Sequence, residues 1–145
     1  MKSTDEAKSS DRNRYEGVVL LDVTPGADEA FDVSFLERSG HTAIVCHGPE
    51  VKQLCPLLGG EGCPKFGAAH GVVFALDLDR PQHRAIIKRY RALARPDLPI
   101  RVVLRPDQAG MYADLLQDVE IWDHEPNVTD LDGFASEVEA ADRFA

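Results

Sequence analysis

Five short apolar runs, separated by segments of helical pattern, constrain the fold of this chain most strongly. Each run is rich in Val, Ile and Leu, which is typical of strands that are buried on both faces. The predicted strands span residues 17–23, 42–46, 71–78, 100–104 and 119–122. Helices are predicted over residues 28–38, 82–94, 107–116 and 129–143. This alternation predicts an α/β fold, a five-stranded parallel sheet between two layers of helices.

The connection between the second and third predicted strands departs from this alternation. Residues 47–70 read HGPEVKQLCPLLGGEGCPKFGAAH, and their content of Gly and Pro is too high for a regular helix. We expect one short helix near residues 50–54, followed by irregular chain. The second helix of the sandwich is therefore predicted to be irregular.

Length and charge limit the possible functions. The chain has 145 residues, which suits a single domain with its own core. Its formal net charge of −9 argues against a general nucleic-acid binder, since phosphate binding needs a basic surface. No apolar run approaches the roughly 20 residues that a membrane-spanning helix requires. We therefore expect no membrane partner.

The first residues differ in composition from the rest. Residues 1–14 are poor in apolar side chains and rich in Lys, Ser, Asp and Arg, which predicts a disordered leader before a single domain over residues 15–145. The leader has no apolar core of a secretory signal, so the predicted compartment is the cytoplasm.

Charged side chains gather where the predicted strands end. Asp22 lies at the end of the first strand, Asp77 and Asp79 at the end of the third, Arg105 after the fourth and Glu125 after the fifth. Because the carboxyl ends of parallel strands meet at one edge of a sheet, these residues are candidates for a shared site.

Three segments at these positions resemble the receiver domain of two-component response regulators. LERSGHTAIVCHGPE (36–50) is similar to the passage from the first helix into the second strand. FALDLDRP (74–81) has the receiver pattern of an Asp followed four positions later by a Pro, here Asp77 and Pro81. WDHEPNVTDLDGF (122–134) is similar to the end of the fifth strand, with Glu125-Pro126 in place of Lys-Pro. The resemblance implies a flavodoxin-like sandwich with strand order 2-1-3-4-5.

The resemblance also implies a site, from which this chain departs. In a working receiver, two acids after strand one and the phosphoacceptor Asp hold Mg²⁺, and a Thr or Ser and a Lys contact the phosphoryl group. Here Asp77 has the phosphoacceptor position, and Mg²⁺ would bind at Asp22 and Asp77. Val23 replaces the second acid, Arg105 the hydroxyl and Glu125 the Lys. We expect a degenerate acid pocket of Asp22, Asp79, Arg105 and Glu125, in which Arg105 and Glu125 pair with one another.

Cysteines and histidines form a second candidate site. Cys46, Cys55 and Cys63 lie in or next to the Gly-rich connection, together with His47 and His70. Thiolates and an imidazole could hold Zn²⁺ or an iron–sulfur cluster. The close pair of cysteines typical of structural zinc sites is absent, so redox-active thiols and inert thiols remain alternative interpretations.

A basic stripe follows one face of the helix predicted at residues 82–94. It consists of Arg84, Lys88, Arg91 and Arg95. The stripe is either a solvated face or a docking surface for an acidic partner or a phosphate-bearing ligand. His83, next to it, is expected to be solvated.

Three functions are compatible with these observations. The first is a stand-alone regulatory module, a pseudo-receiver that acts through protein–protein contacts without conventional phosphorylation. The second is a phosphorylatable single-domain response regulator that uses Asp77. The third is a metal or redox sensor based on the cysteines. We do not expect an enzyme, because the sequence has no nucleophile elbow and no phosphate-binding glycine loop.

Overall fold

A five-stranded parallel sheet forms the centre of the molecule. The computed structural model describes residues 17–24, 30–48 and 62–143. The strands are β1 (Val18–Val23), β2 (Thr42–Cys46), β3 (Gly71–Ala75), β4 (Ile100–Val103) and β5 (Glu120–Trp122). Their order is β2-β1-β3-β4-β5, and every neighbouring pair is parallel. The predicted fold class and strand order are confirmed.

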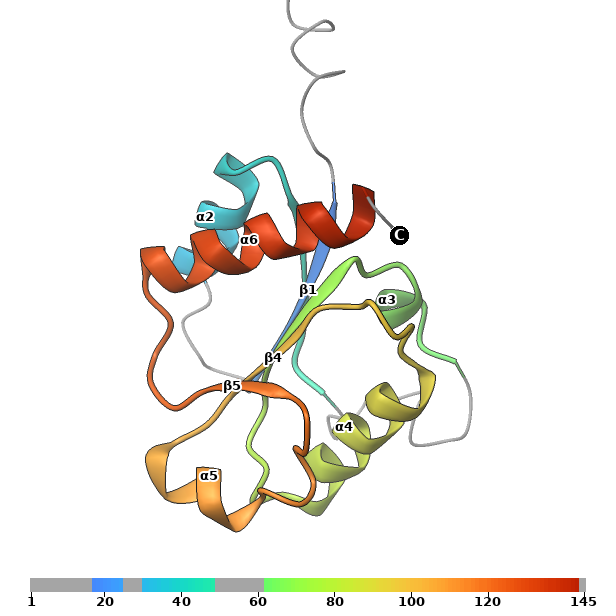
Figure 1. The fold of residues 1–145 in the computed structure, drawn as a ribbon, viewed down its shortest axis with the longest axis vertical. Coiled ribbons are helices and arrows are strands. Elements are labelled where there is room, and N and C mark those ends of the chain that lie inside the picture. Colours follow the sequence, from blue (N-terminus) through green and yellow to red (C-terminus); the bar gives the residue numbers. More distant parts are fainter. Residues whose placement is uncertain (1–16, 25–29, 49–61, 144–145) are drawn as a thin grey trace, which may run out of the picture.

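Helices cover both faces of the sheet, as Figure 1 shows. They are α2 (Ala30–Arg38), α3 (Pro64–Gly67), α4 (Pro81–Leu93), α5 (Pro106–Met111) and α6 (Val128–Arg143). Helices α2 and α6 lie on one face, and α3 and α4 lie on the other (Figure 1). Parallel strands joined by helices require this arrangement, because each crossover places its helix on a face of the sheet.

Each face of the sheet has its own hydrophobic core. On the α2 and α6 side, Leu21 and Val73 pack with Phe134. On the α3 and α4 side, Leu20 and Phe74 pack with a larger group of side chains from α3, α4 and α5. Successive residues of β1 and β3 therefore point to opposite faces, as the geometry of a strand requires.

Local signals in the sequence set several boundaries. Helix α2 ends at Arg38, as predicted, and Gly40 follows it with a φ of 89°. Only glycine adopts this left-handed conformation without strain, which explains the helix end. Gly71 begins β3 directly under α6, where a Cβ atom would collide with the side chain of Val138. The absence of a side chain there allows the helix to lie close to the sheet.

Two boundaries differ from the predictions by several residues, and the second helix is short. Strand β3 ends at Ala75 rather than at residue 78, because the chain turns toward Asp77 although Leu76 and Leu78 stay buried. Helix α5 ends at Met111 rather than at residue 116, just after Gly110, a weak helix former. The second helical position is occupied by α3, which has only four residues.

Some predictions concern residues outside the described ranges. They are the leader at residues 1–14 and the short helix near residues 50–54. Within residues 17–24, 30–48 and 62–143, no helix has the length and apolar content needed to cross a bilayer.

Candidate functional site

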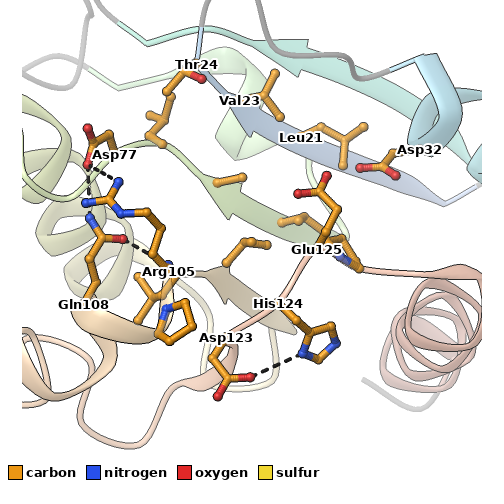
Figure 2. A pocket seen from close by; sticks show the side chains of 17 residues that line it. Leu21, Val23, Thr24, Asp32, Asp77, Arg105, Gln108, Asp123, His124 and Glu125 are labelled. Atoms are coloured by element: carbon orange, nitrogen blue, oxygen red, sulfur yellow. Dashed lines mark hydrogen bonds and ion pairs between the residues drawn. The ribbon is translucent and has the colours of Figure 1, made fainter.

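A pocket of about 600 Å³ opens at the carboxyl ends of β1, β3 and β4 (Figure 2). This edge, beside the point where the strand order reverses between β1 and β3, is the usual ligand position in open α/β sheets. The apolar side chains that line the pocket include Leu21, Val23, Val73, Ala75 and Val103. Four carboxylates also line it, those of Asp32, Asp77, Asp123 and Glu125. Arg105 and His124 contribute the basic side chains.

Asp77 lies two residues beyond β3, where the chain turns toward α4. Its Oδ1 atom accepts hydrogen bonds from the backbone N–H of Asp79, at 3.0 Å, and from Nε2 of Gln108, at 3.1 Å. The nearest guanidinium nitrogen of Arg105 is 3.7 Å away. The Asp77 side chain is 32% exposed. Its charge is therefore balanced by donors and a cation from the protein itself.

Arg105 connects Asp77 to further acids. It precedes α5 and places Nη2 2.5 Å from Oδ2 of Asp79 and Nε 3.4 Å from Oδ1 of Asp107. The hydroxyl of Tyr112 donates to the other oxygen of Asp79, at 2.7 Å. Tyr112 and Arg105 together lower the pKa of Asp79, and Asp79 in turn raises the pKa of Arg105. The prediction that Arg105 pairs with Glu125 is wrong. The guanidinium of Arg105 instead contacts the carboxylates of Asp77, Asp79 and Asp107.

Glu125 enters the pocket from the opposite side, on the segment between β5 and α6. Figure 2 shows its carboxylate pointing away from Arg105 and toward the side where Asp32 lies. The adjacent His124 places Nε2 2.8 Å from Asp130 and Nδ1 3.3 Å from Asp123. Both carboxylates stabilise the protonated ring, and they raise the pKa of His124.

The fold matches receiver domains of known structure. A response regulator receiver domain protein from Methanospirillum hungatei JF-1 aligns with a TM-score of 0.60 at 14% identity, and the receiver domain of Francisella response regulator 1452 with 0.56 at 13%. A sensor protein from Polaromonas sp. JS666 aligns with 0.55 at 18%. Each alignment covers 90% of this chain and all of the other. This chain has the fold of a receiver domain.

At these identities the likeness establishes the fold alone, so each residue of the receiver-like domain has to be judged by its own contacts. No protein-family model and no curated protein sequence matches the chain.

Asp22 does not belong to the pocket, and this prediction is wrong. Side chains alternate along β1, so Leu21 and Val23 line the pocket while Asp22 points to the other face. There Asp22 is 0% exposed. The Tyr90 hydroxyl and the Cys46 thiol lie beside its carboxyl group, but neither makes a hydrogen bond of ordinary geometry with it. Burial raises the pKa of Asp22 to about 7.

The residues of the pocket therefore do not fit the Mg²⁺ site that the receiver fold implies. Asp77 would be one ligand, but Asp22 points away and Val23 offers no oxygen. Magnesium requires oxygen ligands in near-octahedral geometry. Among the residues that the structure describes, no group of three acids, histidines or cysteines is placed to hold a metal ion.

Among the described members of the predicted cysteine and histidine cluster, His70 lies apart from Cys46. Cys46 lies opposite Asp22 in the register of β1 and β2, whereas Nδ1 of His70 accepts a hydrogen bond from the N–H of Val18 at 2.8 Å. Val18 and Asp22 lie four steps apart along β1, or about 13 Å, so Cys46 and His70 cannot share a metal ion.

The remaining described members of this cluster are His47, Cys46 and Cys63. His47 donates to the backbone carbonyl of Val23, at 3.1 Å. Cys46 and Cys63 are partly buried free thiols that pack against the core beside α3 and α4. Burial raises the pKa of Cys46, which disfavours its reactive thiolate. Cys55 lies outside the described residues.

The arginines of the predicted basic stripe bind backbone carbonyls. Arg84 donates to Leu78 at 2.7 Å, Arg91 to Leu115 at 2.6 Å and to Gln117 at 2.5 Å, and Arg95 to Ala69 at 3.4 Å. These bonds tie α4 to the neighbouring loops. Lys88 is exposed and has no hydrogen bond or ion pair within the described part of the chain.

Three residues of the site were not identified from the sequence. Gln108 is almost fully buried and bridges Asp77 and the backbone N–H of Arg105, and Tyr112 holds Asp79. Gln108 is the third residue of α5, and a Gln at this position is a known capping signal that could have indicated its role. His83, which was expected to be solvated, is buried and donates to the carbonyl of Asp77 at 3.0 Å.

Proposed function

We propose that this receiver-like domain is a regulatory module that acts through protein–protein contacts and does not use Mg²⁺-dependent phosphorylation of Asp77. It regulates rather than catalyses. The observation that carries the proposal is the contact of Arg105 with Asp77 and Asp79. A permanent cation of the chain therefore lies beside Asp77, the residue that the resemblance to receivers makes the phosphoacceptor.

The electrostatics of the pocket support this proposal. A phosphoryl group brings negative charge, which must be neutralised by cations and hydrogen-bond donors. The guanidinium of Arg105 is shared among Asp77, Asp79 and Asp107 before any ligand arrives. Glu125, in the position of the receiver lysine, adds negative charge to the same pocket. Glu125 would therefore repel a phosphoryl group on Asp77. The charge of Arg105 would already be neutralised by the three carboxylates that it contacts.

A chain of contacts connects the pocket to the surface of α4. Asp79 binds Arg105 on one side and the hydroxyl of Tyr112 on the other. The guanidinium of Arg84 lies over the ring of Tyr112, 5.8 Å from its centre. In the proposed function, a protein partner contacts α4 at exposed Lys88 and near Arg84, and this chain of contacts links the partner surface to the pocket.

The alternative is a phosphorylatable regulator that uses Asp77. The Asp77 side chain supports this alternative, because it is one-third exposed and lines the pocket. The guanidinium of Arg105 lies 3.7 Å from its carboxylate. Arginine binds phosphate groups well, so Arg105 would have to leave Asp79 and take over the role of the receiver lysine.

Beryllofluoride, which mimics a phosphoryl group on Asp, distinguishes the two functions. We expect that beryllofluoride with Mg²⁺ leaves the amide NMR signals around Asp77 unchanged. The positive control is the triple variant Val23→Asp, Arg105→Thr and Glu125→Lys, which restores the receiver residues and is expected to respond. Saturable shifts in the unmodified chain that disappear in Asp77→Asn would reject the proposal and support the alternative.

A further inference from the structure

Asp22 is a buried acid that the pocket does not use. Its side chain is 0% exposed, and its two oxygens accept no hydrogen bond of ordinary geometry from the described residues. Buried polar groups in proteins are nearly always hydrogen-bonded, because an unpaired carboxyl group in the core costs free energy. An unpartnered acid in the core is therefore a candidate for a chemical role.

Two cysteine thiols lie on the same side of the sheet as the Asp22 side chain. Cys46 is the register partner of Asp22 on β2, and its thiol lies beside the carboxyl group. Cys63 directly precedes α3, and both cysteines pack against the core on the α3 and α4 side. Both are free and partly buried. The fold thus brings one carboxyl group and two thiols into one region.

Helix α3 carries Cys63 to the end of β2. Nζ of Lys65 donates to the backbone carbonyl of Val45, at 3.2 Å, one residue before Cys46. Cys63 lies two residues before Lys65, at the N-cap of the helix. This contact holds the start of α3 beside the last residues of β2.

Tyr90 of α4 reports how close the three groups are. Its ring stacks on that of Phe66 in α3, with centroids 4.2 Å apart. Burial, together with the nearby groups of Asp22, Cys46 and Cys63, raises the pKa of Tyr90. The carboxyl group and both thiols are therefore near enough to act on one hydroxyl.

A groove gives access to one of the thiols. It has a volume of about 280 Å³, and Phe66, Leu93 and Leu98 line it together with Cys63. A small molecule can therefore reach the sulfur of Cys63 from solvent.

We propose that Cys46 and Cys63 form a reversible disulfide with each other, and that Asp22 is the proton acceptor for Cys46. The oxidant is a small-molecule disulfide. A protein disulfide requires Cα atoms about 4.4–6.8 Å apart, and α3, which has a single turn, is the element that adjusts to this distance. The inference goes beyond the proposed function, because it adds control by oxidation to the regulatory module.

The reaction has two steps. The sulfur of Cys63 attacks one sulfur of the small disulfide, which forms a mixed disulfide and releases one small thiol with the proton of Cys63. Cys46 then gives its proton to Asp22, and its sulfur attacks the sulfur of Cys63. The bond to the small molecule breaks, and the second small thiol leaves with the proton from Asp22. The two cysteines are oxidised, and the small disulfide is reduced to two thiols.

Burial explains why Cys46 needs a proton acceptor inside the protein. It raises the pKa of Cys46, so the thiol does not readily lose its proton to solvent. Burial also raises the pKa of Asp22 to about 7, which makes its carboxylate a stronger base than an ordinary one. A base with a pKa near the working pH is the most effective proton acceptor.

The Cys55→Ser variant tests the disulfide, because it keeps only Cys46 and Cys63. The full chain with this substitution is incubated with oxidised glutathione without denaturant, remaining thiols are blocked with iodoacetamide, and the intact mass is measured. We expect the mass to fall by two hydrogen atoms, with no blocked thiol, and dithiothreitol to reverse the change. Free thiols or glutathione adducts as the final product would overturn the proposal.

The unmodified chain tests the choice of partner. Cleavage after Glu61 separates Cys55 from Cys63, so mass spectrometry of the digested protein identifies the linked residues. We expect a peptide pair that contains Cys46 and Cys63. A link through Cys55 in their place would overturn the proposal.

Asp22→Asn tests the proton acceptor, in the Cys55→Ser background. We expect the mixed disulfide to close at least about tenfold more slowly at pH 7, measured by acid quenching and mass spectrometry. With Asp22 present, the rate should rise with pH and level off near pH 7, and Asp22→Asn should remove this feature. A merely structural role would leave the pH profile unchanged.

Asp114→Asn, at an exposed position, is the matched control and is expected to keep both the rate and the profile. Equal rates and profiles in the two variants would overturn the role of Asp22. Since none of these residues takes part in the beryllofluoride test, the two proposals can fail separately.

Discussion

Asp22 lies within β1 and Asp77 lies two residues beyond the neighbouring strand β3, and their carboxyl groups have opposite surroundings. Asp77 is 32% exposed and accepts hydrogen bonds from Asp79 and Gln108. Asp22 is 0% exposed, and within the described part of the chain only the Tyr90 hydroxyl and the Cys46 thiol lie beside it, without hydrogen bonds of ordinary geometry. An acid within a strand meets the core on one face, whereas an acid just beyond a strand meets N–H groups of the turning chain. Asp22 is level with Phe74 in the register, so three positions along the strand direction separate the buried acid from the acid bound by the turning chain.

The largest expected effect comes from Asp22→Asn. Burial raises the pKa of Asp22 to about 7, well above the ordinary value of an Asp, so ionisation of Asp22 in the folded protein is unfavourable. At pH 8 we expect the variant to gain up to about 4 kcal/mol in free energy of unfolding, because it carries no charge in the core. Urea unfolding of both proteins between pH 4 and pH 8 measures this difference.

The contribution of Asp22 to the free energy of unfolding changes with pH in a definite direction. The folded state holds the Asp22 proton more tightly than the unfolded state, so this group lowers stability as pH rises from about 4 to about 7. The advantage of Asp22→Asn should therefore be small at pH 4 and complete near pH 8. Asp114→Asn, at an exposed position, is the control. A variant that is less stable than the unmodified chain at pH 8 would contradict the buried, unpartnered position of Asp22.

Gln108→Leu tests the donors on the Asp77 side and is expected to have the second largest effect. The substitution removes a donor to Asp77 and leaves the N–H of Arg105 without its acceptor. We expect a loss of about 1–3 kcal/mol in free energy of unfolding. The exposed Gln117→Leu is the control, measured by the same urea titration. Equal stability of the two variants would show that Asp77 does not depend on Gln108.

Arg105→Gln should affect stability less, because its side chain is 53% exposed. Its main effect should be on the pKa of Asp79, which Tyr112 and Arg105 hold below the ordinary value. Removal of the guanidinium should raise this pKa. The ¹³C chemical shift of the Asp79 carboxyl group, followed by NMR through acid titration, measures the change.

The effect of Arg105→Gln on stability also depends on pH. A lowered carboxyl pKa stabilises the fold above the ordinary pKa of Asp, and this contribution is lost as pH falls. The difference between the unmodified chain and Arg105→Gln should therefore shrink below about pH 4. Arg38→Gln, in the last turn of α2, is the control. An unchanged Asp79 titration in Arg105→Gln would show that the ion pair does not persist in solution.

Asp77→Asn is expected to have the smallest effect. The amide oxygen of Asn can still accept from the N–H of Asp79 and from Gln108, so we expect a change below about 0.5 kcal/mol in free energy of unfolding. Asp77→Ala, which removes the acceptor, should cost more. Thermal unfolding of the two variants compares them. If the two substitutions have equal effects, the hydrogen bonds to Asp77 do not contribute to stability.

The sequence was sufficient to predict the sheet and its order, because five buried strands and a resemblance to receivers indicated the same architecture. It did not predict the side of β1 on which Asp22 lies. The segment VVLLDV is apolar on both faces, so it has no alternation of polar and apolar residues to fix the orientation of each side chain.

The pocket was predictable in place but not in its contacts. Asp77, Arg105 and Glu125 meet at the carboxyl edge of the sheet, as their positions after the strands indicated. The pairing of Arg105 with Asp79 and Asp107 was missed, because it depends on the turn after β3 and on the start of α5. Long side chains choose among several nearby acids according to local geometry, which residue spacing does not reveal.

A pH titration of the Asp22 carboxyl group tests the account most directly. The ¹³C signal of this group, assigned by its loss in Asp22→Asn, is followed by NMR with and without Mg²⁺. A midpoint near pH 7 that Mg²⁺ does not move is the predicted result. A midpoint near pH 4 that Mg²⁺ lowers further would place Asp22 in a metal-binding acid pair with Asp77 and contradict the account.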